Sequence, residues 1–382
     1  MSAKFQHNEP SKSAQRLVRY WYQRRLAAPL WLLAPFSALF TMLAALRRGL
    51  FFIRLRRTYR APVPVVVVGN VTVGGTGKTP TVLGLVRLLQ QAGYRPGIVS
   101  RGYGGSGPFP MLVATDSKPE ICGDEPVMLA KLSGVPVAVA PKRADAVRLL
   151  LAEKQGLAEN QIDIVIADDG LQHYALGRDI EIAVVDGERG LGNGWRLPAG
   201  PLRESARRLR KVDWVIVNGA AFTTVGQYGE RLKLKPQQRS EKMIAMQLEP
   251  AGWHRVTDHK EIDTPTGENA LAIAGIGNPE RFFKVVMEQA IDLQETRVFP
   301  DHYQYVANDF YNVSNSTPIL MTEKDAVKCA AFARPHWYYL KVVARFSNHF
   351  EAQFLARVAQ LAAPTIATAN SHEQPSSEGV AK

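Results

Sequence analysis

The sequence predicts an α/β fold in which helices flank a mostly parallel sheet. The first observation is a rhythm of short apolar runs that alternate with helical stretches, which is typical of parallel sheets covered by helices. The second is a glycine-rich loop that directly follows the apolar run 63–68. The third is a composition of 46% hydrophobic residues over 382 residues, which is enough for one large core or two modest ones.

The expected elements follow from the positions of these runs. Strands are expected at 63–68, 97–100, 135–140, 162–167, 180–185, 214–217, 243–248, 270–276, 318–321 and 337–343. Helices are expected at 79–92, 125–132, 143–154 and 279–291. The chain then divides into a basic, apolar segment (1–60), a core around the glycine loop (61–220), an irregular or β insertion (221–266), a smaller second α/β subdomain (267–362) and a disordered tail (363–382).

The glycine loop at 69–82 reads GNVTVGGTGKTPTV and predicts a phosphate-binding loop of the P-loop NTPase type. Glycines allow positive φ angles and close approach of backbone N–H groups to phosphate oxygens. Lys78 is expected to reach the β and γ phosphates, and the Thr79 hydroxyl to coordinate Mg²⁺. The strict pattern has Gly where this chain has Thr72. The predicted nucleotide-binding residues are Thr72, Val73, Gly74, Gly75, Thr76, Gly77, Lys78 and Thr79.

Two adjacent carboxylates, Asp168 and Asp169, end the expected strand 162–167. Ligands of open α/β sheets sit beyond the carboxyl ends of the strands, and an apolar strand that ends in such acids is typical of a Mg²⁺ site beside a P-loop. The alternative is an ordinary turn with solvated acids. Asp186, at the end of 180–185, is a weaker candidate of the same kind. His173 either orients the aspartates or caps local backbone.

A second carboxylate pair, Asp124 and Glu125, lies in the sequence GDEP at 123–126. It is a candidate base site, but it is also a good helix start with acids in the first turn. In the carboxyl half, Asp301 and His302 form a pair in which a histidine beside a carboxylate can help to take a proton from an attacking alcohol. Taken alone, His302 also fits an ordinary turn histidine.

Most of the net charge of +12 lies at the amino terminus, where residues 1–60 hold twelve Lys or Arg and the single acid Glu9. The rest of the chain is almost neutral, which argues against nucleic acid as a partner because such a footprint would spread over the folded domain. The uncharged stretch 26–46 is long enough to cross a bilayer, but Pro29 and Pro35 interrupt it and arginines flank both ends. We favour a monotopic, cytoplasm-facing anchor over a true span. A buried helix hairpin is the alternative.

Two further segments carry charge or flexibility. The loop SRGYGG at 100–105 is expected to be a flexible loop beside the nucleotide site. The segment LPAGPLRE at 197–204 leads into a basic run that contacts either substrate phosphate or lipid headgroups, or is a solvated helix face. That run consists of Arg207, Arg208, Arg210 and Lys211.

Together these motifs resemble the tetraacyldisaccharide 4′-kinase family, the lipid A 4′-kinases of Gram-negative bacteria. The resemblance runs from about residue 14 to 345, and beyond 345 no shared pattern is evident. It rests on NVTVGGTGKTP at 70–80, SRGYGG at 100–105, GDEP at 123–126, DDGLQHYAL at 168–176, NGWRLPAGPLRE at 193–204, AGIGNPERFF at 274–283, DH at 301–302 and MTEKDAVKC at 321–329. Family members carry Ser or Thr where the strict P-loop pattern has Gly, so Thr72 is not a departure from the family.

The resemblance implies an enzyme that transfers the γ-phosphate of ATP, with Mg²⁺, to the 4′-hydroxyl of an acylated glucosamine disaccharide 1-phosphate. It implies a monotopic protein on the cytoplasmic face of the bacterial inner membrane, with the bilayer as a partner. It also implies that Asp124 is the base and His302 its partner, with Lys78 in a catalytic role. The resemblance places the metal at Thr79, Asp168 and Asp169. It also implies that Arg101 and Tyr103, with Glu125 and His173, line the mouth of the active site.

The alternative function is a membrane-associated P-loop GTPase or ATPase switch without lipid kinase activity. A GTPase switch needs the pattern Asp-x-x-Gly, but Leu171 stands where that Gly belongs after Asp168. It also needs an Asn-Lys-x-Asp base reader, and the chain reads Asn-Gly-Ala-Ala at 218–221. These two departures favour the kinase.

Overall fold

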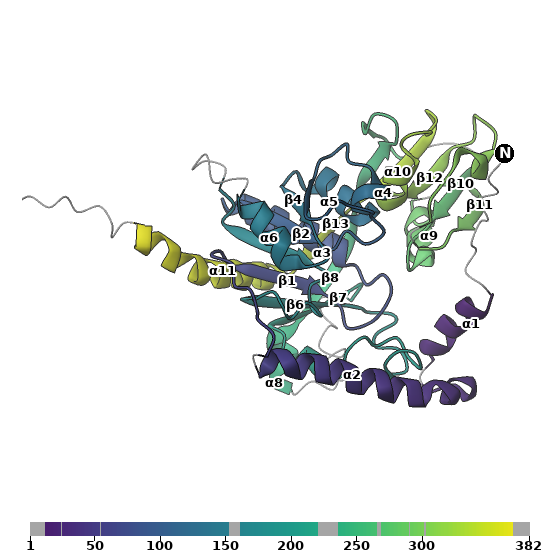
Figure 1. Cartoon of the computed structure of the whole chain (residues 1–382). Helices are drawn as coiled ribbons and strands as arrows, with labels where there is room; N and C mark the ends of the chain where they lie inside the picture. Colours follow the sequence, from purple (N-terminus) through teal and green to yellow (C-terminus); the bar gives the residue numbers. More distant parts are fainter. Residues whose placement is uncertain are drawn as a thin grey trace, which may run out of the picture.

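The computed structural model describes residues 12–23, 25–53, 55–152, 161–220, 236–265, 269–289, 291–301 and 303–369. Across these residues one sheet of thirteen strands runs through the molecule, in the order β11-β10-β12-β13-β8-β7-β6-β1-β5-β2-β4-β3, with β9 paired to β8 (Figure 1). Neighbouring strands are parallel except at β3–β4, β8–β13 and β8–β9. The predicted mostly parallel sheet with flanking helices is confirmed.

The strands are short except for the two that pair in the middle of the sheet. Their bounds are β1 Val65–Gly69, β2 Pro96–Ser100, β3 Met111–Val113, β4 Val137–Val139, β5 Ile164–Asp168, β6 Ile180–Asp186, β7 Trp214–Asn218, β8 Met243–Arg255, β9 Glu261–Ile262, β10 Ala270–Ala274, β11 Leu293–Val298, β12 Ile319–Thr322 and β13 Trp337–Phe346. Each strand expected from an apolar run is present.

Helices cover both faces of this sheet and one edge of the molecule. Their bounds are α1 Lys12–Trp21, η1 Ala28–Leu33, α2 Ala34–Phe52, α3 Lys78–Gln91, α4 Pro119–Cys122, α5 Asp124–Ser133, α6 Arg143–Ala152, η3 Ala206–Arg210, α8 Pro236–Lys242, α9 Pro279–Met287, η4 Ala307–Phe310, α10 Glu323–Cys329 and α11 Asn348–Ala369. The symbol η marks a 3₁₀ helix.

The alternation of side chains along β1 explains why its sequence is apolar throughout. Val66 and Val68 enter the core beneath α3, α5 and α11, whereas Val65 and Val67 enter the core on the opposite face with α6. A parallel strand covered on both faces must be apolar at every position. Two smaller cores lie farther along the sheet, one with α10 and one with α9.

We call the strands β1–β7 with helices α3–α6 the P-loop side, and β8–β13 with α9 and α10 the carboxyl-terminal side. The two sides are joined through β7–β8 pairing and are seen at opposite ends of the sheet in Figure 1. Helix α11 returns to the P-loop side, where Phe350, Phe354 and Val358 pack in the core with Leu85. Helix α11 therefore packs on the P-loop side, although it follows the last strand of the carboxyl-terminal side.

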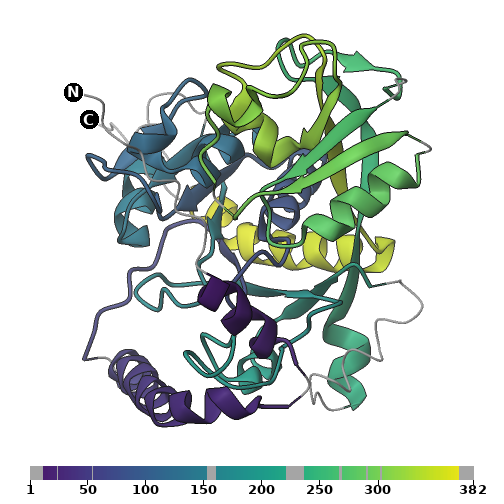
Figure 2. The same cartoon turned by 90° about the vertical axis from the view of Figure 1, so that its right-hand side faces the viewer.

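The apolar amino-terminal segment forms a helix on the outside of the molecule. Its two prolines sit at helix starts, Pro29 in η1 and Pro35 in α2, where a missing N–H is harmless. The stretch Ala28–Phe52 has the length and hydropathy of a membrane helix, and only 11% of its most apolar window is buried. That exposure excludes the buried hairpin. Figure 2 shows α2 lying along one edge of the body, away from the sheet.

Three strands were not predicted from the sequence: β3, β9 and β11. β3 (MLV) and β9 (EI) have only three and two residues, too few to stand out as apolar runs. β11, with the sequence LQETRV, is an edge strand whose side chains are half-buried or exposed, so the pattern that marks central strands is missing. In the region expected to be an insertion, residues 236–265 form α8 and two strands of the main sheet, and 221–235 lie outside the described residues. Of the expected tail, the first residues continue α11 to Ala369, and 370–382 lie outside the described residues.

Candidate active site

The phosphate-binding loop follows β1 and ends in α3, as the sequence predicts. Gly74 and Gly77 have φ angles of 96° and 94°, which side chains with a Cβ rarely adopt. The backbone of Thr72 bridges to Leu202, and Val73 N–H donates to the Pro201 carbonyl at 2.8 Å. The segment 197–204 (LPAGPLRE) thus contacts the phosphate-binding loop and supports it. Thr72 is buried by that contact, so its position is a packing site.

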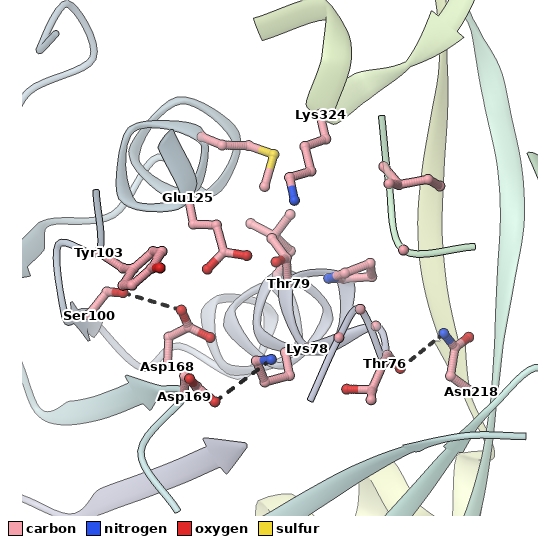
Figure 3. Close-up of a pocket in the computed structure, with 18 of the residues that line it drawn as sticks. Thr76, Lys78, Thr79, Ser100, Tyr103, Glu125, Asp168, Asp169, Asn218 and Lys324 are labelled. Carbon is pink, nitrogen blue, oxygen red and sulfur yellow. Dashed lines mark hydrogen bonds and ion pairs between the residues drawn. The ribbon is translucent and has the colours of Figure 1, made fainter. Parts of the chain in front are cut away.

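Lys78 lies at the first position of α3, where it faces the paired aspartates. Its ammonium group is 3.7 Å from Asp169 Oδ1, and Arg203 Nη1 donates to both oxygens of Asp169 at 3.2 and 3.0 Å. Burial raises the pKa of Asp169, but Lys78 and Arg203 outweigh burial and hold that pKa below its usual range. Asp169 is therefore an ionised partner that positions Lys78 (Figure 3).

Asp168 has a different environment from its neighbour. Ser100 Oγ donates to its Oδ2 at 3.3 Å, while Oδ1 is buried without a hydrogen-bond partner among the described residues. Burial, with Glu125 and Asp169 nearby, raises the pKa of Asp168 well above its usual range. An open carboxylate oxygen of this kind fits a hard divalent cation, which would relieve the cost of the buried charge.

The surroundings of Asp168 fit Mg²⁺ better than a metal held only by protein. Within the described part of the chain, His, Cys, Asp and Glu form no group of three that could hold a metal. Mg²⁺ at nucleotide sites commonly takes one or two protein oxygens and completes its shell with phosphates and water. Thr79 and Asp168 both line the cleft, and Figure 3 shows Glu125 pointing toward them. The weaker candidate Asp186 also lines the cleft, and its Oδ1 accepts the N–H groups of Glu188 and Arg189.

Asp124 lies in the first turn of α5, and Gly123, with a φ of 89°, occupies the cap position before it. The side chain faces the carboxyl-terminal side, where Lys328 Nζ lies 3.7 Å from Oδ2. That lysine also donates to the Tyr303 carbonyl at 3.1 Å. The GDEP acid thus reaches the cleft and does not serve as the helix cap. His302, its expected partner, lies outside the described residues.

The carboxyl-terminal side contributes cations to the same cleft. Lys324 Nζ donates to Asp301 Oδ1 at 2.9 Å, and Figure 3 shows Lys324 pointing toward Thr79 and Glu125. Lys324 and Lys328 both project from α10. The start of that helix is fixed by Thr322, whose hydroxyl accepts the Asp325 N–H. Burial and the nearby Lys324 lower the pKa of Lys328.

The phosphate-binding loop is braced by Asn218 of the P-loop side and is contacted by residues of the carboxyl-terminal side. Asn218, at the end of β7, donates to the Thr76 carbonyl at 3.2 Å and accepts from Arg281 of α9 at 2.9 Å. Gly277 packs so closely on Gly75 that a Cβ at position 277 would lie only 2.9 Å from the Gly75 backbone nitrogen. Asn218 is therefore a brace for the loop, which is incompatible with a free base-reading Asn of a GTPase.

The mouth residues expected from the sequence all line one cleft of ≈2040 Å³. Tyr103 is 71% exposed, Arg101 is exposed, and Glu125 and His173 are half-buried. Burial and the nearby Arg143 and Arg101 lower the pKa of His173 to about 3. His173 therefore stays neutral at neutral pH.

The cleft extends from the phosphate-binding loop to α2, where Phe40, Leu43 and Ala44 line it beside Arg47 and Arg48. A ligand that fills it needs an anionic end and an apolar end. Sequence reasoning assigned no role to Asn218, Arg281, Lys324, Lys328 or Arg203. All but Asn218 lie within the motifs that carry the family resemblance, and this position in a motif was the one signal that could have identified them. Their partners could not be read from the sequence, because they lie more than twenty residues away along the chain.

Comparison with known proteins gives one consistent result. Residues 29–359 match the family model described as Tetraacyldisaccharide-1-P 4'-kinase. A Tetraacyldisaccharide 4'-kinase of Idiomarina loihiensis is 44% identical, covering 90% of this chain and 97% of that protein. One of Tolumonas auensis is 46% identical, covering 90% and 98%. A crystal structure of LpxK from Aquifex aeolicus in complex with ATP superposes with a TM-score of 0.69 at 27% identity, covering 86% of this chain and 99% of that one.

Proposed function

Because this chain belongs to the tetraacyldisaccharide-1-P 4′-kinase family, we propose that it transfers the γ-phosphate of ATP to the 4′-hydroxyl of tetraacyldisaccharide 1-phosphate. The product is lipid IVA, and the reaction is a step of lipid A synthesis. The observation that carries the proposal is the single cleft, which joins the phosphate-binding loop, Asp124 and the apolar wall of α2. A nucleotide and an acylated sugar require such a combination in one site.

In the proposed reaction, the enzyme contributes position and charge. The backbone N–H groups of residues 74–79 and the Lys78 ammonium hold the β and γ phosphates, while Arg203 and Asp169 hold Lys78 in place. Asp124 accepts the proton of the 4′-hydroxyl as its oxygen attacks phosphorus in line with the leaving oxygen. His302 is the proposed partner of Asp124.

The proposed Mg²⁺ site consists of Thr79, Asp168 and Asp169. Asp168 supplies the buried open oxygen, and Asp169 borders the site while it is paired to Lys78. When bound, Mg²⁺ neutralises phosphate charge. Arg101, Tyr103, Glu125 and His173 are proposed to border the acceptor sugar, because they line the mouth of the cleft.

We place the protein on the cytoplasmic face of the inner membrane as a monotopic protein. Large apolar side chains of η1 and α2 are exposed, among them Leu32 at 80% and Phe52 at 88%. Burying such side chains in lipid is favourable, and the basic residues at both ends of the helix match anionic headgroups. The acyl chains of the substrate would then reach the cleft along α2.

Transfer of labelled γ-phosphate tests this function. The purified chain is incubated with labelled ATP and tetraacyldisaccharide 1-phosphate in detergent micelles, and label in the lipid is measured beside label in free phosphate. We expect label in the lipid that depends on the acceptor. Release of free phosphate with no labelled lipid would support an ATPase or switch instead.

A further inference from the structure

A second, smaller cavity of ≈380 Å³ lies beside the cleft and is lined by arginines. Its walls are Gly194, Arg196, Leu202, Ser205, Ala206, Arg207 and Arg210. No acidic residue stands among these described lining residues. Its volume is within the range of small-ligand sites. A cavity with three guanidinium groups and no carboxylate in its wall has the chemistry of an anion site.

This arginine cavity is fastened to the apolar helix α2. The carbonyl of Arg196 accepts a hydrogen bond from Ser37 Oγ at 2.9 Å, and the same hydroxyl accepts the Ala199 N–H at 2.9 Å. Trp195 packs edge-on against Trp31 of η1, the 3₁₀ helix that leads into α2, with ring centroids 6.0 Å apart. A helix that lies in the headgroup region of a bilayer would therefore bring the cavity to the same depth.

The basic run at 207–211 divides into side chains with different tasks. Arg208 is buried and forms ion pairs with Glu181 and Glu204, so it holds the fold together. Arg207 and Arg210 are exposed and line the arginine cavity. Lys211 instead lines the main cleft. The sequence left open whether this run is a solvated face or contacts an anion. In the structure, these tasks fall to different residues of the run.

We propose that the arginine cavity binds the phosphate of an anionic bilayer phospholipid, and so aligns the mouth of the cleft with the membrane surface. Guanidinium groups bind phosphate oxygens in bidentate pairs, which adds specificity beyond charge. Arg207 and Arg210 line only this cavity, whereas the cleft has its own cations for the substrate, among them Arg101 and Arg47. A separate ligand is therefore favoured over the phosphate of the substrate.

The inference depends on the membrane placement proposed above, but its test requires no kinase activity. The full chain is mixed with phosphatidylcholine vesicles that contain either phosphatidylglycerol or an ionised fatty acid at equal surface charge, and bound protein is measured by flotation. The test variant is Arg207→Gln/Arg210→Gln. The matched control is Arg25→Gln/Arg57→Gln, which removes two exposed arginines of the basic amino-terminal segment that do not line the cavity.

We expect wild type to prefer phosphatidylglycerol over the fatty acid. The test variant should lose that preference and bind phosphatidylglycerol vesicles about tenfold more weakly, whereas the control should weaken equally on both vesicles and keep the preference. Equal binding of wild type and the test variant would overturn the proposal. So would equal loss by the test variant on both vesicle types, because that result indicates charge alone.

A kinetic arm separates the bilayer from the substrate as the source of the phosphate. In micelles of neutral detergent without phospholipid, the test variant should have an unchanged KM for tetraacyldisaccharide 1-phosphate. A KM raised about tenfold there would mean that the cavity takes the phosphate of the substrate, and the proposal would fail. If neither wild type nor the variants phosphorylate the lipid, the proposed function is wrong. The vesicle experiment would still test whether the arginine cavity binds phospholipid.

Discussion

The P-loop side and the carboxyl-terminal side meet at one cleft and contribute different groups to it. The P-loop side presents the acids Asp124, Asp168 and Asp169 with Lys78 among them. The carboxyl-terminal side places Lys328 of α10 beside Asp124 and adds Lys324 to the cleft. Opposite charges across a joint between two parts of a sheet hold the parts in register. We infer that the first side carries the chemistry and that the second side positions it.

The largest effect is expected when the P-loop side loses its cation. Lys78→Ala removes the charge that faces the phosphates and leaves Asp169 with Arg203 alone. We expect kcat to fall about 10³-fold, as for other groups that stabilise transition-state charge. Steady-state transfer of labelled phosphate measures this. The control Lys284→Ala removes a lysine that is 76% exposed on α9 and should leave kcat unchanged; a comparable loss in both variants would refute the assignment.

Loss of the proposed base should come next. Asp124→Asn keeps the size of the side chain but cannot accept the hydroxyl proton, so kcat should fall about 10²- to 10⁴-fold. Nucleotide affinity, measured by calorimetry, should change little, because Asp124 lies on α5 and not on the phosphate-binding loop. Equal turnover of Asp124→Asn and wild type would remove Asp124 from the mechanism.

The carboxyl-terminal side is tested directly by Lys328→Met, which removes the ammonium group 3.7 Å from Asp124. If that side acts by positioning Asp124, kcat should fall about tenfold and the nucleotide Kd should remain the same. Lys328→Arg should restore part of the activity. A fall as deep as that of Lys78→Ala would mean that the second side takes part in the chemistry, and the division drawn above would be wrong.

The smallest expected effects concern stability, and they differ in sign between the two sides. On the P-loop side, the pKa of His173 falls from its usual 6.5 to about 3. The neutral imidazole therefore stabilises the fold fully above pH 6.5, and this contribution is lost as pH falls from 6.5 toward 3. Between pH 7 and 5, Tm of wild type should drop about 2–4 °C more than Tm of His173→Gln, measured by calorimetry. An equal change of Tm with pH in wild type and His173→Gln would contradict this prediction.

On the carboxyl-terminal side, burial raises the pKa of Glu323 from its usual 4.5 to about 7. Its neutral form stabilises the fold fully below pH 4.5, and that contribution is lost as pH rises through 7. Glu323→Gln should therefore gain stability relative to wild type between pH 6 and 8, by about 2 °C in Tm. No relative gain would show that Lys341 and Arg87, the nearby cations, already compensate the ionised carboxylate.

Much of the P-loop side was predictable because its signals are local. The apolar run at 63–68, the glycines after it and Lys78 stand in one stretch of sequence, and the strand 162–167 delivers Asp168 in the same way. The carboxyl-terminal side was predictable in its central strands and in α9, which was expected at 279–291. The edge strand β11 lacks an apolar run because half of its surroundings is solvent.

The different tasks of neighbouring residues were decided by packing. Asp168 and Asp169 are equivalent in sequence, yet Arg203 and Lys78 pair with one and leave an oxygen of the other open. Arg207 and Arg208 are likewise adjacent, yet one is exposed and the other is buried against Glu181. Sequence pattern carries residue type and period, and these do not specify which side chain faces a partner far away along the chain.

By itself, the sequence determined the α/β class, the phosphate-binding loop, the apolar exterior helix and the family, because each depends on residues close together or on motifs in a fixed order. Tertiary structure alone decided that α10 places Lys328 beside Asp124, that Asn218 braces Thr76, and that one cleft runs from Lys78 to α2. The physical reason is that ion pairs and cavities form between surfaces, and the sheet decides which surfaces meet.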